Sequence, residues 1–565
     1  MIDMNNFEKY EKTYFMPPVV TYDWVKKTEI EKPPVWCSVD LRDGNQALIE
    51  PMNVDEKMEM FDLLLRLGFK ENEIGFPAAS QIENDFLRKL VAENKIPDDV
   101  KVQVLTQCRQ ELVDRTFEAI QGIKNVVVHI YNSTSTLQRD VVFNKSQDEI
   151  IDIAIAGTRM VKEHLTDFDG NVQLEYSPES FTGTEVDFAL RICTAVQKEW
   201  DHATDAPIIF NLPATVEMNT PNVYADQIEW MSTHFEDRDN IILSVHPHND
   251  RGTGVAITEL ALLAGADRVE GTLLGNGERT GNVDILTVAY NMFSQGINPE
   301  LEIEDVKEIV EIYERCCKMH VDMRHPYAGK LVFTAFSGSH QDAINKGVHA
   351  MQERGNEYWE VPYLPIDPAD IGRKYEPVVR INSQSGKGGV AFVMDTVYGY
   401  KLPKKMQREF ADVIQYISEQ EGGEVEPQKM MEAFKKEYFE NKMPFELVFV
   451  DIDDNMANDE THVSLDFKYN GKAIHSEADG NGPIDAVKLA VKQCVPQVDF
   501  SVLDYSEHSL GKGSGAKAAA YIEMRDNRSG NITFGVGVSS NITRASIRGM
   551  FSAMNRLAKK AKDYV

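Results

Sequence analysis

The chain has 565 residues, with 90 acidic and 59 basic side chains and a formal net charge of -31 at pH 7. This length exceeds what one hydrophobic core normally supports, so we expect one large domain and at least one more. The excess of negative charge argues against nucleic acid as a partner, because a polyanion is bound mainly through positive charge.

The N-terminal residues lack a basic region followed by an apolar one, and no run approaches the roughly 20 apolar residues that a membrane span needs. We therefore expect a cytoplasmic protein that has no membrane partner. The six cysteines are scattered without a Cys-x-x-Cys pair, which predicts reduced, mostly buried thiols and neither a disulfide framework nor a structural zinc knuckle.

Residues 1–34 are predicted to form an extended arm, because prolines at positions 17, 18, 33 and 34 disfavour regular structure. Strand-like and helical patterns then alternate. The strand-like runs are residues 35–41, 73–76, 102–108, 126–131, 172–176, 207–212, 241–245 and 268–273, and the helical patterns include residues 55–67, 81–93, 148–165 and 253–264.

Eight strands that alternate with helices predict a (β/α)8 barrel, the TIM barrel, over residues 35–333. The rival architecture is an open doubly wound sheet. We prefer the barrel because no Gly-x-Gly-x-x-Gly turn follows the first strand.

The stretch 241–250 reads Ile-Ile-Leu-Ser-Val-His-Pro-His-Asn-Asp, a buried strand with polar residues at its carboxyl end. Residues two apart share one face of a strand, so His246 and His248 would point at the same place. An isolated pair fits a hydrogen-bonded strand end equally well. Asp43 and Asn282 also follow strand-like runs, however, and the four together would make a mixed nitrogen and oxygen site for Zn²⁺, Mn²⁺ or Mg²⁺.

Polar residues follow each predicted strand and would form one rim at the carboxyl ends of the barrel strands, where such barrels place catalytic groups. A divalent ion at this rim would act as a Lewis acid on a carbonyl and would clamp a 2-oxo carboxylate. The rim comprises Arg42, Asp43, Gln46, residues 77–81, Gln107, Arg109, His129, Tyr131, Asn132, Glu175, Ser177, Glu179, Pro213, Thr215, His246, His248 and residues 276–282.

Several of these motifs closely resemble the 2-isopropylmalate synthase family, in its long type with a C-terminal leucine-regulatory domain. The motifs are residues 41–47, 75–81, 129–135, 175–180, 246–250 and 275–282, and the match continues through 336–344 and 382–389 to the C-terminus. The resemblance implies the first committed step of leucine biosynthesis. In this step acetyl-CoA condenses with 3-methyl-2-oxobutanoate (2-oxoisovalerate), and thioester hydrolysis releases 2-isopropylmalate and CoA.

The resemblance also implies roles for individual residues. Asp43, His246 and His248 match the metal ligands of the family, and Asn282 matches a fourth ligand. Arg42 matches an arginine beside the developing alkoxide, while His129, Ser177 and Thr215 match groups that hold the oxo acid. The implied cofactor is a divalent metal (Mg²⁺, Mn²⁺ or Zn²⁺), with acetyl-CoA as co-substrate and K⁺ as an activator.

Glu179 and His340 resemble the pair that removes a proton from the methyl group of acetyl-CoA. In the family, the equivalent of His340 reaches the active site of the partner subunit of a homodimer. His340 also fits a helix-capping or interface histidine. Glu175 lies an even number of residues before Glu179, so strand periodicity leaves both glutamates open and the resemblance favours Glu179.

Residues 334–428 are predicted to form linker subdomains, with helical stretches at 341–354 and 405–419 around a proline-rich span. Tyr363 corresponds to a family tyrosine associated with coupling inhibitor binding to the active site, although it also fits an ordinary packing tyrosine. The glycine-rich stretch 385–389 invites comparison with a phosphate-binding loop. Ile381 occupies the position of the glycine that such a loop requires, so we reject that reading.

Residues 429–565 carry an internal repeat that predicts two βββα units. The predicted strands are 445–451, 463–469 and 472–477, then 500–505, 518–523 and 531–538, and the helices are 484–493 and 544–558. Gly480, Asn481, Gly482 and Pro483 precede the first helix, where backbone N–H groups can receive a carboxylate, although tight turns with helix caps explain them equally. The resemblance implies that this domain binds leucine, a feedback inhibitor, at the dimer interface. Asp485 stands where some members have a small apolar residue, which argues against leucine contact at this position.

Other functions remain open. Homocitrate synthase and citramalate synthase share the metal constellation and differ in the pocket for the oxo-acid side chain. An aldolase or lyase of the same barrel superfamily would not need the paired C-terminal repeats. A sensing module on an inactive barrel is a non-enzymatic alternative, and the retention of all four expected ligands argues against it.

Overall fold

A computed structural model of the chain describes residues 8–335, 337–355, 357–375, 387–421, 425–455, 460–511 and 515–560. The chain divides into two compact units, Met1–Val332 with Ile366–Lys374 and Phe333–Pro365 with Tyr375–Val565. Residues 385 and 386 of the glycine-rich stretch at 385–389 lie outside the described residues.

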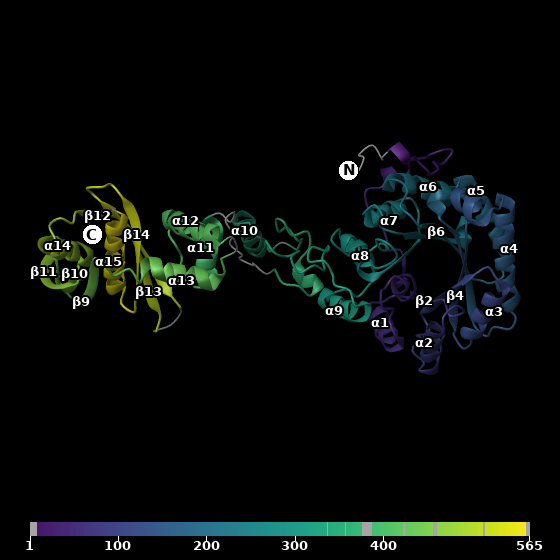
Figure 1. The fold of residues 1–565 in the computed structure, drawn as a ribbon, viewed down its shortest axis with the longest axis horizontal. Coiled ribbons are helices and arrows are strands. Elements are labelled where there is room, and N and C mark those ends of the chain that lie inside the picture. Colours follow the sequence, from purple (N-terminus) through teal and green to yellow (C-terminus); the bar gives the residue numbers. More distant parts are fainter. Residues whose placement is uncertain are drawn as a thin grey trace. The chain divides into compact units, whose positions relative to one another are not determined.

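The first unit is a closed barrel of eight parallel strands in sequential order, so the predicted TIM barrel is confirmed (Figure 1). All eight predicted strands are present, with ends that differ by a few residues. The strands are β1 Val35–Ser38, β2 Glu71–Gly75, β3 Lys101–Gln107, β4 Asn125–Ser133, β5 Asn171–Glu179, β6 Ile208–Ala214, β7 Ile241–Pro247 and β8 Arg268–Gly271.

Helices connect these strands and surround the barrel (Figure 1). Local sequence explains where several begin: Asn53 and Ser146 each form a reciprocal capping box, with Glu56 and Glu149 respectively. The helices are α1 Val54–Arg66, α2 Gln81–Ala92, α3 Gln110–Ala119, α4 Gln147–His164, α5 Val186–Trp200, α6 Pro221–His234, α7 Gly254–Leu263, α8 Ile285–Phe293 and α9 Val306–Cys317.

The barrel interior is polar and charged, which the apolar strand patterns did not reveal. Glu71, Gln103, Arg268 and Glu270 are all buried there, and the guanidinium group of Arg268 contacts the other three. A buried charge is tolerated only when it is paired and hydrogen-bonded, and this cluster meets that condition.

The N-terminal arm follows the barrel surface, and the 3-10 turn at Trp24–Lys26 anchors it. The Trp24 indole donates to Asp226 at 2.8 Å, and the Trp24 backbone N–H donates to Glu229 at 2.7 Å. Both acceptors lie on α6. Further hydrogen bonds join the arm to the barrel, from Gln227 to the Phe15 carbonyl oxygen at 2.7 Å and from Lys27 to the Leu263 carbonyl oxygen at 2.7 Å.

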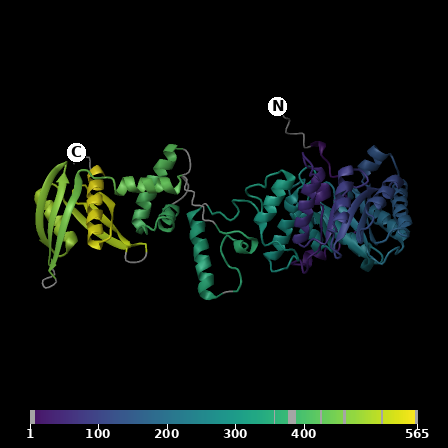
Figure 2. The ribbon, with the colours of Figure 1, turned by 90° about the horizontal axis from the view of Figure 1, so that it is seen from below.

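In the second unit, two βββα repeats confirm the predicted internal duplication. The first comprises β9 Phe445–Asn455, β10 Glu460–Tyr469, β11 Lys472–Gly480 and α14 Pro483–Cys494. The second comprises β12 Phe500–Leu510, β13 Lys517–Asp526, β14 Ile532–Ser539 and α15 Ile542–Lys560. Each set of strands forms its own antiparallel sheet, and Figure 2 shows α15 running alongside the strands.

Alternate residues of β13 enter two different cores. Ile522 and Met524 pack with α14, α15 and the first sheet. Ala519 and Tyr521 point to the opposite face, where they pack with α11 Lys387–Thr396, α12 Lys404–Glu421 and α13 Pro427–Tyr438. The helices of the predicted linker therefore share a core with the C-terminal repeats, and position 429 falls inside α13. The remaining helix of this unit is α10 Gly338–Arg354.

All six cysteines are free thiols, as predicted, and four of them are buried. None of the described helices combines the length and the apolar character needed to cross a bilayer.

Candidate active site

Arg42 and Asp43 lie in a π-helical turn, Asp40–Gly44, that follows β1. Asn276 donates to the carbonyl oxygen of Gly44 at 2.9 Å and ties the turn to the loop after β8. The Arg42 Nη1 donates to Asp43 Oδ1 at 2.8 Å. The turn therefore presents a guanidinium group and a carboxylate side by side at the carboxyl end of the barrel.

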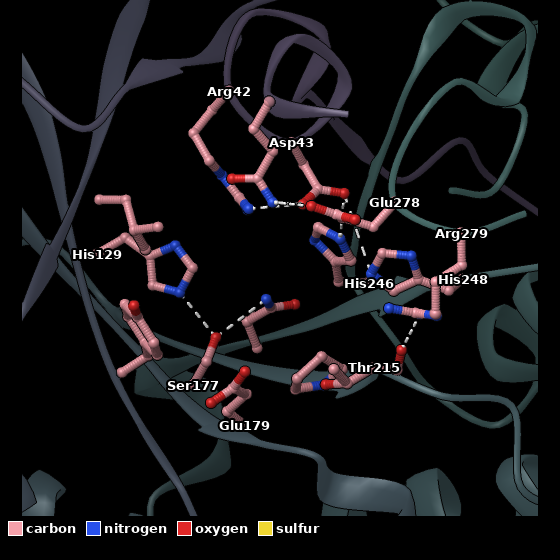
Figure 3. A pocket seen from close by; sticks show the side chains of 15 residues that line it. Arg42, Asp43, His129, Ser177, Glu179, Thr215, His246, His248, Glu278 and Arg279 are labelled. Atoms are coloured by element: carbon pink, nitrogen blue, oxygen red, sulfur yellow. Dashed lines mark hydrogen bonds and ion pairs between the residues drawn. The ribbon is translucent and has the colours of Figure 1, made fainter. Parts of the chain in front are cut away.

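Asp43, His246 and His248 lie close together, as predicted, although Asp43 is far from the two histidines in the sequence. One ligand atom from each lies within 4.8 Å of the others, and all three residues are buried. The Nε2 atoms of His246 and His248 lie 3.9 and 4.0 Å from Asp43 Oδ2. Figure 3 shows the three side chains together on one side of the pocket. This separation leaves room for one cation between them.

Asn282 reaches the same place because its loop folds back sharply. Gly281 has φ +102°, and a Cβ atom there would lie 1.9 Å from the Gly275 carbonyl oxygen, so only glycine fits. Asn282 Nδ2 donates to Asp43 Oδ2 at 2.6 Å, while its buried Oδ1 has no hydrogen-bond partner. An orphaned buried oxygen next to the three ligands fits a cation site, since such an atom otherwise costs stability.

The protonation states of Asp43 and His248 also fit a cation. Burial would raise the pKa of Asp43, but Arg42 and the two imidazoles hold it below its usual value. Burial lowers the pKa of His248 to about 4, so this imidazole is neutral at pH 7. Burial acts in the same direction on His246, but Glu270 outweighs it and raises its pKa. Asp43 and His248 are therefore in the forms that bind metal, whereas a metal would have to displace the proton that Glu270 favours on His246.

A cavity of about 230 Å³ opens beside these residues. It is lined by Arg42, Asp43, Gln46, Leu105, His129, Tyr131, Ser177, Glu179, Asn211, Pro213, Thr215, His246, His248, Glu278 and Arg279. Almost all of the predicted barrel site residues therefore line one pocket. Asn282 is not among the lining residues and contacts the pocket residue Asp43 through its hydrogen bond.

The predicted oxo-acid residues come from three neighbouring strands or the loops after them. His129 Nε2 lies 2.7 Å from Ser177 Oγ, and the two face the metal group across the pocket (Figure 3). Thr215 Oγ1 accepts the backbone N–H of Ser180 at 3.0 Å, which orients the loop after Glu179. Glu179 itself accepts from Ser133 Oγ.

The structure separates the two glutamates that strand spacing left open. Glu179 lines the pocket, whereas Glu175 is fully buried inside the barrel, 3.4 Å from Arg268. Burial, together with the nearby charge of Glu270, raises the pKa of Glu175 well above its usual value. Glu175 therefore belongs to the barrel interior, and Glu179 is the glutamate that a ligand can meet.

Two lining residues, Leu105 and Asn211, were missed, because they lie within strands and not after them. Glu278 and Arg279 were noted only as members of a loop. Glu278 accepts from Gln46 at 3.2 Å, and Arg279 donates to Asp250 at 2.7 Å. A polar residue inside an otherwise apolar strand, as at Asn211, was the available signal for this kind of position.

Comparison with known proteins places the whole chain. The 2-isopropylmalate synthase of Clostridium acetobutylicum is 52% identical and covers 98% of this chain and 99% of its own length. That of Acetoanaerobium sticklandii is 50% identical, with 99% and 98% covered. The chain belongs to the 2-isopropylmalate synthase family. The relative from Agrobacterium fabrum is 52% identical, with 95% and 96% covered.

Domain comparisons agree with this family. An HMGL-like domain matches residues 33–312, a domain described as alpha-isopropylmalate synthase, post-catalytic domain-like, matches 330–395, and a LeuA allosteric (dimerisation) domain matches 424–558. Among solved structures, an HMG-CoA lyase from Brucella melitensis is 15% identical and covers 51% of this chain and all of its own, with a TM-score of 0.42. Membership of the 2-isopropylmalate synthase family identifies the chain as an enzyme.

Two residues singled out by the family resemblance lie in the second unit. His340 is exposed on α10, and its ring stacks on Tyr363 with centroids 4.1 Å apart. Tyr363 is 63% exposed and has a positive φ of 66°. The pocket described above is lined by the first unit alone. The roles expected for His340 and Tyr363 in the 2-isopropylmalate synthase family remain predictions.

Gly480, Asn481, Gly482 and Pro483 join β11 to α14, at the helix start where they were expected. A Cβ atom on Gly480 would lie 2.5 Å from the Ala486 nitrogen, so the turn requires a glycine there. Asp485 Oδ2 accepts the backbone N–H of Asn481 at 3.4 Å. A carboxylate of the chain itself thus occupies one N–H group at this helix start. An anionic regulator would have to compete with this carboxylate for that N–H group.

Proposed function

We propose that the chain condenses acetyl-CoA with 3-methyl-2-oxobutanoate and hydrolyses the thioester to 2-isopropylmalate and CoA. The observation that carries this proposal is the convergence of Asp43, His246 and His248 in a pocket that also contains Arg42 and Glu179. The relatives at about 50% identity over nearly the whole chain bear the name 2-isopropylmalate synthase, which supports the same reaction. We also propose that the reaction takes place in the cytoplasm.

Asp43, His246 and His248 would hold a divalent ion, Mg²⁺, Mn²⁺ or Zn²⁺, and Asn282 would contribute a fourth group once its Oδ1 turns toward the ion. Such an ion, when bound, supplies Lewis acidity to a carbonyl and a fixed positive charge for a carboxylate. The mixed set of nitrogen and oxygen donors suits all three metals. We also propose K⁺ as an activator.

Glu179 would take the proton from the methyl group of acetyl-CoA. Carbon acids of this kind are weak, so the base must lie close and the enolate must meet its electrophile at once. Ser133, which donates to Glu179, would hold the carboxylate in place. In the homodimer we propose, His340 of the partner subunit would assist this step.

The enolate carbon would then attack the ketone carbon of the oxo acid, forming the new carbon–carbon bond and turning the ketone oxygen into an alkoxide. Arg42 would stabilise this negative charge with a guanidinium group that is already fixed by Glu73 and Asp43. His129, Ser177 and Thr215 would hold the oxo acid. Water then cleaves the thioester, and CoA leaves as a thiol.

Homocitrate synthase and citramalate synthase chemistry would use the same metal group and differ only in the oxo acid accepted. Thiol release from acetyl-CoA, measured with 3-methyl-2-oxobutanoate, pyruvate and 2-oxoglutarate in turn, tests this choice. We expect the first substrate to give the highest kcat/KM, and chelation of metal to abolish the rate. A higher kcat/KM with pyruvate or 2-oxoglutarate would reject the proposed substrate.

We further propose that leucine is a feedback inhibitor bound by the C-terminal repeats at the turn Gly480 to Pro483, where the residues before Pro483 offer backbone N–H groups. The match to a LeuA allosteric (dimerisation) domain over residues 424–558 supports both leucine control and a homodimer. Leucine should lower the rate of thiol release and raise the melting temperature. If saturating leucine changes neither quantity, this part of the proposal is wrong.

A further inference from the structure

Glu270 on β8 is fully buried beneath the pocket, and its carboxylate meets four hydrogen-bond donors. Its Oε2 accepts from His246 Nδ1 at 2.7 Å and from Asn211 Nδ2 at 3.1 Å. Its Oε1 accepts from Arg268 Nη1 at 2.9 Å and from Gln103 Nε2 at 2.7 Å. A carboxylate held by so many donors keeps one fixed orientation.

This contact determines which nitrogen of His246 carries the proton. Both oxygens of Glu270 receive hydrogen bonds from these side chains, so Glu270 acts as an acceptor toward His246. His246 Nδ1 therefore carries a hydrogen, and in the neutral imidazole the Nε2 lone pair is then free toward Asp43. His248 differs, because its buried Nδ1 has no hydrogen-bond partner.

The same carboxylate reaches the opposite side of the pocket. Asn211, which lines the cavity, donates through Nδ2 to both Glu270 and Ser177, at 3.1 Å each. Ser177 in turn lies 2.7 Å from His129 Nε2. One buried side chain thus connects the metal group to the residues proposed to hold the oxo acid.

We propose that Glu270 is a positioning residue that holds His246 with Nε2 directed at a divalent ion and holds Asn211 against Ser177. This inference rests on the proposed function, which makes His246 a metal ligand. When a carboxylate accepts the second N–H of a metal-binding histidine, mutation of that carboxylate typically weakens metal affinity by about 10- to 100-fold.

Glu270→Gln tests this role in the full-length protein. After the metal has been stripped, titration calorimetry with Mn²⁺ should show binding weaker by about 10- to 100-fold than in the wild type. The visible absorption spectrum of the Co²⁺-loaded protein should also change, because the geometry at His246 is altered. A role confined to folding would move neither quantity in protein that remains folded.

Glu71→Gln is the matched control. Glu71 is also buried and accepts from Arg268 Nε at 2.6 Å, but none of its hydrogen bonds or ion pairs involves His246. Both variants should lower the melting temperature, whereas only Glu270→Gln should weaken Mn²⁺ binding. Glu270→Asp covers the case in which Glu270→Gln does not fold. It keeps the charge that Arg268 needs and withdraws the carboxylate from His246 by one methylene group.

The role of Glu270 is overturned if Glu270→Gln, or Glu270→Asp in its place, binds Mn²⁺ as tightly as the wild type while His248→Gln does not. It is equally overturned if Glu71→Gln weakens Mn²⁺ binding as much as Glu270→Gln does. If the wild type binds Mn²⁺ no more tightly than His248→Gln, the proposed metal site itself is wrong, and the role of Glu270 fails with it.

Discussion

Glu175 and Glu179 lie on the same strand, β5, yet they meet different surroundings. Glu175 is fully buried and lies 3.4 Å from Arg268 inside the barrel, whereas Glu179 lines the pocket and accepts from Ser133. Strand periodicity directs both to the inside of the barrel, and their depth along the strand distinguishes them. Depth therefore separates a structural carboxyl group from one that can act on a substrate.

Glu179→Gln should remove the proposed base while preserving the shape of the side chain. We expect kcat for thiol release to fall by about 10²- to 10⁴-fold, with little change in the KM for the oxo acid, because a general base contributes about that much. Glu118→Gln, an exposed glutamate on α3, is the isosteric control and should keep normal turnover. A Glu179→Gln enzyme with near-normal kcat would remove this residue from the mechanism.

Local patterns in the sequence were sufficient for the barrel. Apolar runs of strand length alternate with amphipathic helices, and the motifs that follow the runs led to Asp43, His246 and His248. The inner layer of the barrel was not predictable in this way. Glu270, Glu71 and Arg268 stabilise one another only after the barrel closes, and each alone would argue against a buried strand.

The packing of the second unit shows the same limit. The heptad-like pattern of α12 indicates an amphipathic helix but does not say which surface its apolar face covers. In the structure, Phe410 and Ile414 pack with Tyr521 and Phe534 of the second repeat. These contacts join segments that lie about a hundred residues apart in the sequence. No local sequence pattern predicts them, because they form only when the chain folds.

Asp40 gives a prediction about pH. This buried carboxyl accepts from Ser38 and from the Leu273 backbone, and burial raises its pKa to about 7. Between pH 4 and 7 the group ionises in the unfolded chain but stays protonated in the folded one. The folded state therefore binds more protons, and stability falls as pH rises through this range and is unaffected by this group above it.

Asp40→Asn removes this titration. Between pH 5 and 7 the wild type should lose about 2 kcal/mol of unfolding free energy relative to the variant. Urea unfolding followed by tryptophan fluorescence measures it, because Trp24, Trp36, Trp200 and Trp230 lie in the first unit and only Trp359 lies in the second. Wild-type and variant stabilities that change in parallel with pH would show that Asp40 does not titrate as stated.

The attachment of the N-terminal arm gives a third prediction. Trp24 is buried and is held by Asp226 and Glu229, so Trp24→Ala should cost about 3 kcal/mol of arm docking. Limited proteolysis should then cleave the arm faster than in the wild type. Tyr10→Ala, at an exposed residue of the same arm, should leave the cleavage rate unchanged. Equal rates for Trp24→Ala and the wild type would contradict the anchoring role.

The boundary predicted at residue 429 can be tested through Arg556 on α15. This buried guanidinium group contacts Glu409 on α12, Glu437 on α13 and the Phe534 carbonyl oxygen on β14. If α12 and α13 are part of the C-terminal fold, Arg556→Ala leaves the half-buried carboxylates of Glu409 and Glu437 without this guanidinium group and should cost about 1–3 kcal/mol. Calorimetry should show the unfolding transition of the second unit at a lower temperature and that of the barrel unchanged.

Arg548→Ala is the control for this prediction. Arg548 is an exposed arginine on the same helix that donates to a backbone carbonyl, so its removal should shift neither transition appreciably. If the Arg556→Ala protein melts like the Arg548→Ala protein, α12 and α13 contribute little to the stability of the repeats. The domain boundary would then lie at residue 429, as the sequence predicts.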